Sequence, residues 1–186
     1  MSSDSLVKMM EKYQQEYYES QGKNMFFKKG QKQDCAKGVS QTFPLEDMLK
    51  KTIYIIPEKN QLVFDYTVFK LFATSDNFEA IIKRVIDSYD ILLNKYPNFE
   101  VHINLDGFTI SAAERYKSVI QLFCNKCMTA QTRYTTFIRA MYLYYTPSMI
   151  ENISTLLKPF IDPIILQRIV MYSKSESPAL FTQFRI

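Results

Sequence analysis

The chain is 186 residues long, with 47% hydrophobic and 23% charged residues, a balance typical of one folded domain and not of a disordered, collagen-like or coiled-coil chain. Its formal net charge of +4 arises in residues 23–37, which hold five lysines and one aspartate, while the remainder is neutral. A basic nucleic-acid-binding surface on the domain is therefore not expected. With only four glycines, neither a Walker loop nor a dinucleotide-binding fingerprint can be assembled, so nucleotide binding by those routes is excluded.

Residues 1–42 are predicted to form an N-terminal helix followed by a basic flexible arm. Apolar residues recur every three or four positions from Leu6 to Tyr18, as they do in an amphipathic helix, and Gly22 would end that helix. The stretch that follows is rich in glycine, lysine and glutamine, which is typical of a linker.

The arm contains Phe26, Phe27, Lys28 and Lys29 in succession. Aromatic rings sit at the headgroup level of a bilayer and lysines are attracted to anionic lipids, so these four residues are candidates for contact with a peripheral anionic membrane. A solvated flexible tail is the more common use of such a segment, and composition alone favours that second interpretation.

Strands alternate with helices between residues 43 and 174, which predicts one α/β domain. Ser111 and Ser148 each precede a glutamate by three residues, the spacing of a capping box. Residues 175–186 are predicted to be a polar C-terminal tail. In chain order we expect strands at 52–56 and 62–72, a helix at 78–93, a strand at 101–105, a helix from 111, a strand at 141–145, a helix from 148 and a strand at 169–172.

The three cysteines favour a reducing compartment, since the first residues lack the charged and apolar regions of a secretory signal. No stretch approaches the roughly eighteen apolar residues that cross a bilayer. We therefore expect a cytoplasmic protein whose contact with membranes is peripheral.

Two blocks of sequence resemble one known family. Residues 104–113 read N-L-D-G-F-T-I-S-A-A and resemble the D-L-x-G-x-S-x-S motif of CRAL-TRIO lipid-binding domains, whose type members are phosphatidylinositol transfer proteins. Residues 142–147 stand where the family has a strand ending in I-I-N-A-P. Residues 157–169 are similar to the family's K-P-F-L-D-P followed by S-K-I, and this second block is the more specific one.

The resemblance implies a mixed sheet floor with helices on one side and a gating helix on the other, enclosing an apolar pocket. The 13 Tyr, 14 Phe and 9 Met residues suit a pocket for acyl chains, although an aromatic-rich core would explain them equally well. The gate would span residues 159–167. The gate or pocket residues that follow from this are Pro159, Phe160, Ile161, Ile164 and Ile165.

The resemblance also implies three ligand contacts. Thr109 and Ser111 match the alternate serine or threonine positions that bind the inositol phosphate group in phosphatidylinositol-binding members. Arg168 matches the lysine of S-K-I, where a cation would pair with a phosphate. From the residues alone, Ser111 is better explained as a helix cap, and Arg168 is equally well explained as a solvated surface charge.

The chain departs from the family pattern at several points. The family's Y-P-E-R turn would fall at residues 134–137, so Thr136 stands where the family has a glutamate that holds inositol. The helical module that precedes the lipid domain in the family is reduced to at most one helix. These features indicate a shortened and divergent member.

Metal and enzyme chemistry are poorly supported. Cys124 and Cys127 have the spacing of half a zinc site, but they lie on a predicted helix and no second pair exists, so neither a metal nor a cofactor is expected. His102 lies within a predicted strand and is expected to be a packed core residue. An enzyme built on these three residues is the weakest hypothesis.

We therefore predict a non-catalytic domain that binds a phospholipid or other hydrophobic ligand and transfers it between membranes as the gate opens. The alternative is a protein-interaction or scaffold module that keeps the fold and has lost its lipid, which would make a protein the partner. The volume of the pocket distinguishes the two hypotheses. An interaction module would have a pocket filled by side chains, whereas a lipid-binding domain would have an open cavity.

Overall fold

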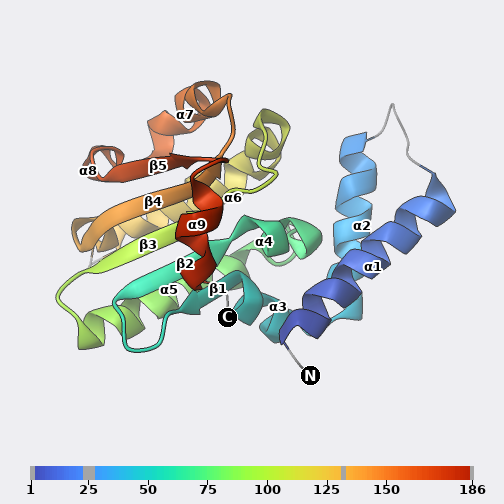
Figure 1. The fold of residues 1–186 in the computed structure, drawn as a ribbon, viewed down its shortest axis with the longest axis horizontal. Coiled ribbons are helices and arrows are strands. Elements are labelled where there is room, and N and C mark those ends of the chain that lie inside the picture. The colour runs from blue at the N-terminus through green and yellow to red at the C-terminus, as the bar shows by residue number, and fades with distance from the viewer. Residues whose placement is uncertain (1–2, 23–27, 131–132, 185–186) are drawn as a thin grey trace.

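The computed structural model of the protein describes residues 3–22, 28–130 and 133–184 (Figure 1). A five-stranded sheet forms its centre, with the strands in the order β1-β2-β3-β4-β5. β1 runs antiparallel to β2, and the other neighbouring pairs are parallel, so the predicted mixed sheet of an α/β fold is confirmed. The bounds are β1 (Ile53–Ile55), β2 (Gln61–Asp65), β3 (Phe99–Asn104), β4 (Ile138–Thr146) and β5 (Ile169–Ser173).

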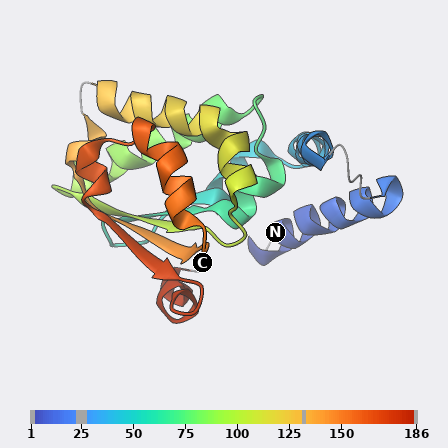
Figure 2. The ribbon, with the colours of Figure 1, turned by 90° about the horizontal axis from the view of Figure 1, so that it is seen from above.

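The longer helices of the domain pack on one face of this sheet. The connections between the parallel strands contain α5 (Phe78–Lys95), α6 (Ile110–Thr129), α7 (Ile150–Leu157) and α8 (Pro163–Leu166). Crossovers between parallel strands are almost always right-handed, and the strand order advances in one direction, so every connection falls on the same face. Figure 2 shows α6 in yellow and α7 in orange on one side of the sheet and the dark red C-terminal helix on the other.

The expected position of the gate on the opposite face is wrong. Residues 159–167 belong to η2 (Lys158–Phe160), α8 and the turn between them, and these follow α7 in the β4–β5 connection. This connection obeys the same handedness as the others, so the segment lies on the face that α5 and α6 cover.

Side chains divide the sheet into two chemically different faces. On β3, Val101 and Ile103 point towards the helices, while Glu100, His102 and Asn104 lie on the other face, because successive side chains alternate. The helix-facing side is largely aliphatic. The other side carries rings and polar groups.

Residues 62–72, predicted as one strand, divide into β2 and helix α4 (Tyr66–Phe72). Asp65 ends the strand and caps the helix, since its carboxylate accepts a hydrogen bond from the Thr67 amide at 2.8 Å. The aromatic and β-branched residues of the segment favoured a strand. Burial of Phe69 and Phe72 in the core stabilises the helix instead.

Most of the described N-terminal region is helical. α1 (Ser3–Gln21) covers the predicted helix, and α2 (Lys28–Thr42) and α3 (Leu45–Thr52) follow. The flexible arm is therefore wrong for residues 28–41. Cys35, Ala36 and Val39 share one side of α2 and are buried there, and α2 packs against α4.

The expected polar tail after residue 174 is also replaced by helical structure. α9 (Ser177–Phe181) and η3 (Thr182–Phe184) cover the second face of the sheet. Phe181 and Phe184 are buried against Val63 and Tyr144. The two phenylalanines supply the apolar side that a short helix needs in order to dock on the sheet.

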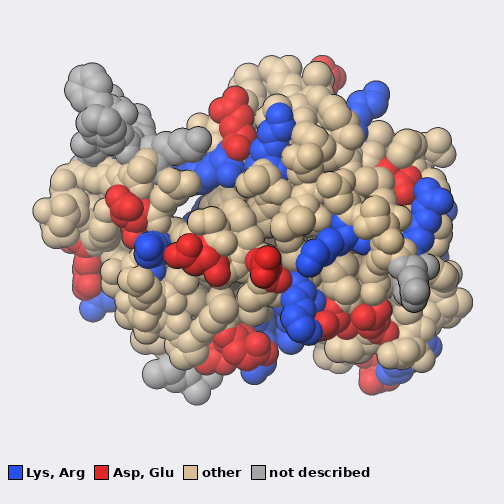
Figure 3. Space-filling view, turned by 180° about the vertical axis from the view of Figure 1, so that it is seen from behind, with Lys and Arg blue, Asp and Glu red and all other residues tan. Residues whose placement is uncertain are grey.

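No helix within the described ranges has both the length and the apolar character needed to cross a bilayer. On the surface shown in Figure 3, lysine and arginine side chains are interspersed with acidic ones and do not gather into one patch.

Candidate ligand-binding cavity

A cavity of about 570 Å³ lies between the sheet and the helices that cover it. This volume falls within the ~300–1,000 Å³ of pockets that enclose one small molecule. Its floor is the helix-facing side of the sheet, and its roof is formed by α5, α6, α7 and α8. Floor residues include Leu62, Phe64, Val101, Ile103, Met141 and Leu143, and roof residues include Ile82, Val85, Val119, Ile120, Ile153 and Leu157.

Few polar residues interrupt this lining. Apart from tyrosines and cysteines, they are Thr135, Ser154, Lys158 and Asp162, all on the side of the cavity formed by the turn before β4 and by α7, η2 and α8. Lys158 and Met171 are the exposed members of the lining, so the cavity comes nearest to the surface beside η2 and β5. An enclosure of this kind suits an apolar molecule better than a charged one.

Asp162 anchors the segment that closes this side. Its carboxylate accepts hydrogen bonds from the Ile164 amide at 2.9 Å, which caps α8, and from the Thr135 hydroxyl at 2.7 Å. Arg133 lies 3.7 Å away. The amide and hydroxyl bonds, with the nearby guanidinium, hold the pKa of Asp162 below its usual value, so the charged form is the stable one.

The apolar cavity between a mixed sheet and its helices agrees with what the comparisons find. The sequence pattern of the CRAL/TRIO domain matches residues 77–185, which is more than half of the chain. The chain belongs to the CRAL/TRIO domain family. No curated protein matches it. Membership supports the binding or transfer of a hydrophobic ligand as the general function. Domains of this family are generally not catalytic.

Within this CRAL/TRIO domain, two of the five predicted gate or pocket residues line the cavity. Ile161 and Ile165 contribute to the lining, whereas Pro159, Phe160 and Ile164 do not. The Phe160 ring lies outside the lining, with the Lys117 ammonium 5.4 Å from its centre. The segment consists of a 3-10 turn and a short helix, whose side chains point outwards in all directions around each axis, so only part of them can face the cavity.

Thr109 and Ser111 lie at the amino end of α6, are both exposed, and are not part of the lining. Thr109 is the N-cap, because its hydroxyl accepts from the Ala112 amide at 3.2 Å. The expected cap at Ser111 is therefore wrong by two residues. The other expected capping box also fails, since Met149 and not Ser148 precedes α7. The three-residue spacing from a serine to a glutamate thus predicted roughly where these helices start, but not which residue caps them.

Arg168 has a structural role. One guanidinium nitrogen donates to the carbonyl oxygens of Thr135, Thr136 and Ile138, which joins the residue before β5 to the turn before β4. Arg168 is half-buried and does not line the cavity. These hydrogen bonds hold the chain in place directly after residues 159–167, the predicted gate. The sequence alone could not distinguish this structural role of Arg168 from contact with a ligand.

The candidate membrane-contact residues are only partly within the described chain. Phe26 and Phe27 lie outside the described residues. Lys28 and Lys29 begin helix α2.

Two of the three cysteines line the cavity from α6. Burial raises the pKa of Cys124 to about 11 and that of Cys127 to about 12, so both thiols are protonated at neutral pH and are poor nucleophiles. Within the described parts of the chain, no three acidic, histidine or cysteine side chains come together as a metal site.

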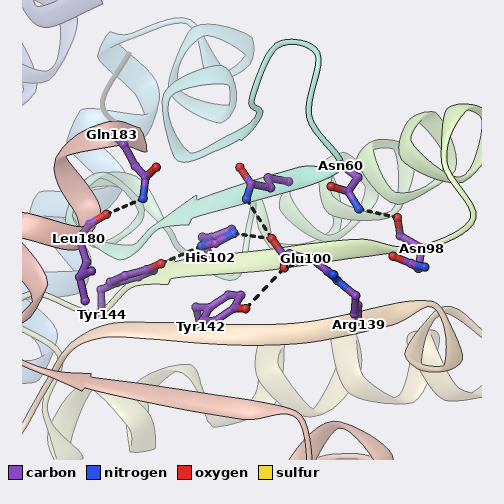
Figure 4. Close-up of polar contacts among 10 residues, drawn as sticks. Asn60, Asn98, Glu100, His102, Arg139, Tyr142, Tyr144, Leu180 and Gln183 are labelled. Atoms are coloured by element: carbon purple, nitrogen blue, oxygen red, sulfur yellow. Dashed lines mark hydrogen bonds and ion pairs between the residues drawn. The ribbon is translucent and has the colours of Figure 1, made fainter.

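His102 lies on the opposite face of the sheet from the cavity, in a polar cluster with Glu100 (Figure 4). Its Nδ1 is 2.9 Å from the Tyr144 hydroxyl, and its Nε2 is 3.6 Å from a Glu100 oxygen. Burial lowers the pKa of His102 to about 4 and outweighs the opposing effect of Glu100, so the ring is neutral. The Phe184 ring covers it at 4.2 Å between centroids, which agrees with a packed residue.

Glu100 is the charged member of this cluster. Although burial by itself raises the pKa of a carboxyl group, hydrogen bonds from Gln61 and Arg139 lower that of Glu100 below its usual value. The Tyr142 hydroxyl also points to it. The Glu100 carboxylate is thus paired by several hydrogen bonds beneath the C-terminal segment.

The lining contributed by α5 and α7 was not predicted as part of a site. Ile81, Ile82 and Val85 were recognised in the sequence as an apolar helical stripe, and a stripe that lines a cavity has the same pattern as one that packs in a core. No signal in the sequence separates the two, because the cavity depends on how far apart the packed layers lie.

Proposed function

We propose that the protein binds one hydrophobic ligand, a phospholipid or another lipid-like molecule, in the cavity and carries it between membranes without making or breaking a covalent bond. The observation that carries this proposal is the 570 Å³ space, which the chain leaves unfilled although aliphatic side chains surround it. Interiors are normally packed to the density of organic crystals, so a space of this size in an apolar setting is suited to an apolar occupant.

The segment Pro159–Gln167 is proposed as the gate. It closes one side of the cavity with one 3-10 turn and the four-residue α8, whereas α5 and α6 are 18 and 20 residues long. A short segment loses few buried contacts when it moves, so opening there costs less than displacing a long helix. Asp162 and Arg168 hold its carboxyl half to the turn before β4, which leaves the part near η2 as the moving end.

The phosphate of such a ligand is proposed to lie at the amino end of α6. Thr109 and Ser111 are exposed there, and the positive end of the helix dipole favours an anion. Lys70 is close by, since its ammonium would be 3.0 Å from a Cβ placed on Gly107. The site faces the carboxyl ends of the parallel strands, where ligands of α/β folds commonly bind. Arg168 lies at the other end of the gate, where its guanidinium is engaged with backbone carbonyl oxygens.

Loading and release require a membrane, and the basic start of α2 is proposed to supply part of that contact. Lys28 and Lys29 would attract anionic lipids over about one Debye length, so attachment should weaken as salt increases.

The test is mass spectrometry of the purified full chain under native conditions, paired with extraction of its lipids. A stoichiometric lipid in the wild type, lost in Val119→Trp, would support the proposal because the indole would occupy the cavity. The matched control is Ser118→Trp, which puts the same ring on the exposed side of α6 and should retain the lipid. A wild-type protein that is empty and takes up nothing from mixed liposomes would overturn the proposal in favour of an interaction module.

A further inference from the structure

One end of the cavity combines a buried tyrosine with two cysteines. Tyr89 of α5 and Cys124 and Cys127 of α6 all belong to the lining there. Cys124 and Cys127 are three residues apart and so share one side of their helix. We refer to these three residues as the Tyr89 end of the cavity.

The Tyr89 hydroxyl is the polar group at this end. The residue is 1% exposed, and no other described residue forms a hydrogen bond with its hydroxyl. The two thiols lie near it and are weak hydrogen-bonding groups. Buried hydroxyls almost always have a partner, so this one has an unused donor beside the cavity.

A neighbouring tyrosine shows the ordinary arrangement. The ring of Tyr134 lies 5.6 Å from that of Tyr89, does not line the cavity, and donates its hydroxyl to Asp90 at 2.7 Å. Tyr89 and Tyr134 thus have the same side chain in adjacent positions. Among the described residues Tyr134 has a hydrogen-bond acceptor, whereas Tyr89, which lies in the lining, has none.

The position of this hydroxyl relative to the proposed phosphate site limits the ligand. Ser111 and Cys127 are sixteen residues apart on α6, and a rise of 1.5 Å per residue separates them by about 24 Å along the helix axis. A molecule that reaches from one to the other needs a long aliphatic chain, because the walls between them are apolar.

We propose that the Tyr89 end binds a polar group at the far end of an aliphatic ligand, with the Tyr89 hydroxyl donating a hydrogen bond to a hydroxyl or carbonyl oxygen. This inference rests on the proposed function and narrows it to a lipid that carries oxygen at both ends. An unsubstituted chain would place a methyl group against the hydroxyl and leave the donor unpaired, which is the less stable arrangement.

The test compares palmitate with omega-hydroxypalmitate, which differ only by a hydroxyl on the last carbon. Both are titrated into the full-length wild type and the variants Tyr89→Phe and Tyr134→Phe by displacement of a fluorescent fatty acid. The measured quantity is the ratio of the two dissociation constants in each protein. Thermal unfolding of each variant checks that it is folded.

In the wild type and in Tyr134→Phe, the dissociation constant of palmitate divided by that of omega-hydroxypalmitate should be about 2- to 10-fold larger than in Tyr89→Phe. This factor corresponds to the free energy of one hydrogen bond. Palmitate should bind Tyr89→Phe at least as tightly as it binds the wild type, because its terminal methyl group offers the Tyr89 hydroxyl no acceptor. The same ratio in the wild type and in Tyr89→Phe would overturn the inference and leave the proposed function standing. Failure of the wild type to bind either chain would overturn both.

Discussion

Single residues fix the path of the backbone where β3 turns into α6. Gly107 has a φ of +74°, in the left-handed region that glycine enters without steric cost. Two residues later Thr109 caps the helix. Together they place the amino end of α6, and hence the proposed phosphate site, at the carboxyl end of the sheet.

Gly107→Ala should lower the free energy of unfolding by about 1–2 kcal/mol, because the methyl group is disfavoured in the left-handed region. It would also meet the Lys70 ammonium at 3.0 Å. Urea unfolding of the purified variant measures the change. Gly30→Ala is the matched control, since Gly30 lies in α2 with no atom near its Cβ, and there the substitution should be neutral or stabilising by up to about 1 kcal/mol. Equal effects at the two glycines would contradict the conformational argument.

At the scale of elements, the C-terminal segment is the cover of the second sheet face. The Tyr145 amide donates to the Ser177 hydroxyl at 2.7 Å, and the Tyr54 hydroxyl donates to the Phe184 carbonyl at 2.9 Å. These bonds join α9 and η3 to β4 and β1. The Phe181 and Phe184 rings then shield His102 and Tyr144 from water.

Phe184→Ala should therefore cost about 3–5 kcal/mol of stability, the usual range for removing a buried phenylalanine. Leu180→Ala in the same segment is the control, because Leu180 is 38% exposed and a surface change costs about 0.5 kcal/mol or less. Thermal or urea unfolding distinguishes the two. If both variants were equally stable, the segment would not be docked as described.

The boundary between strand and helix in residues 62–72 shows what can be predicted at this scale. The sequence correctly predicted a strand at its start, and the apolar stripe at 78–93 correctly predicted α5. Asp65 was not recognised as a cap because capping depends on a hydrogen bond to the Thr67 amide, which exists only once the chain turns. In α2, the three buried positions were too few to outweigh the glycines and lysines around them.

At the scale of the whole molecule, the neutral His102 makes stability depend on pH. Burial lowers its pKa from 6.5 to about 4, so the unfolded chain binds the proton more strongly than the folded one. The neutral His102 ring therefore makes its full contribution to the free energy of unfolding above pH 6.5, and this contribution is lost as the pH falls from 6.5 towards 4. The stability lost over this range amounts to about 3 kcal/mol, since each unit of difference in pKa corresponds to about 1.36 kcal/mol.

His102→Asn should flatten this dependence, because the amide can still bond to the Tyr144 hydroxyl but does not titrate. Urea unfolding from about pH 7 to about pH 4.5 would measure the slope in both proteins. This range of pH lies above the range in which Glu100 loses its charge, since the pKa of that carboxyl group lies below 4.5. An unchanged slope in the variant would assign the pH dependence to other groups.

The sequence by itself determined the α/β class and the family, because periodicity and short motifs are local properties of the chain. The tertiary structure alone decided that residues 159–167, the proposed gate, lie on the same face as α5 and α6, since the face follows from the handedness of the crossovers and the order of the strands. It also decided which apolar stripes enclose a space rather than fill it. Cavity volume depends on the distance between packed layers, and no local pattern of residues specifies that distance.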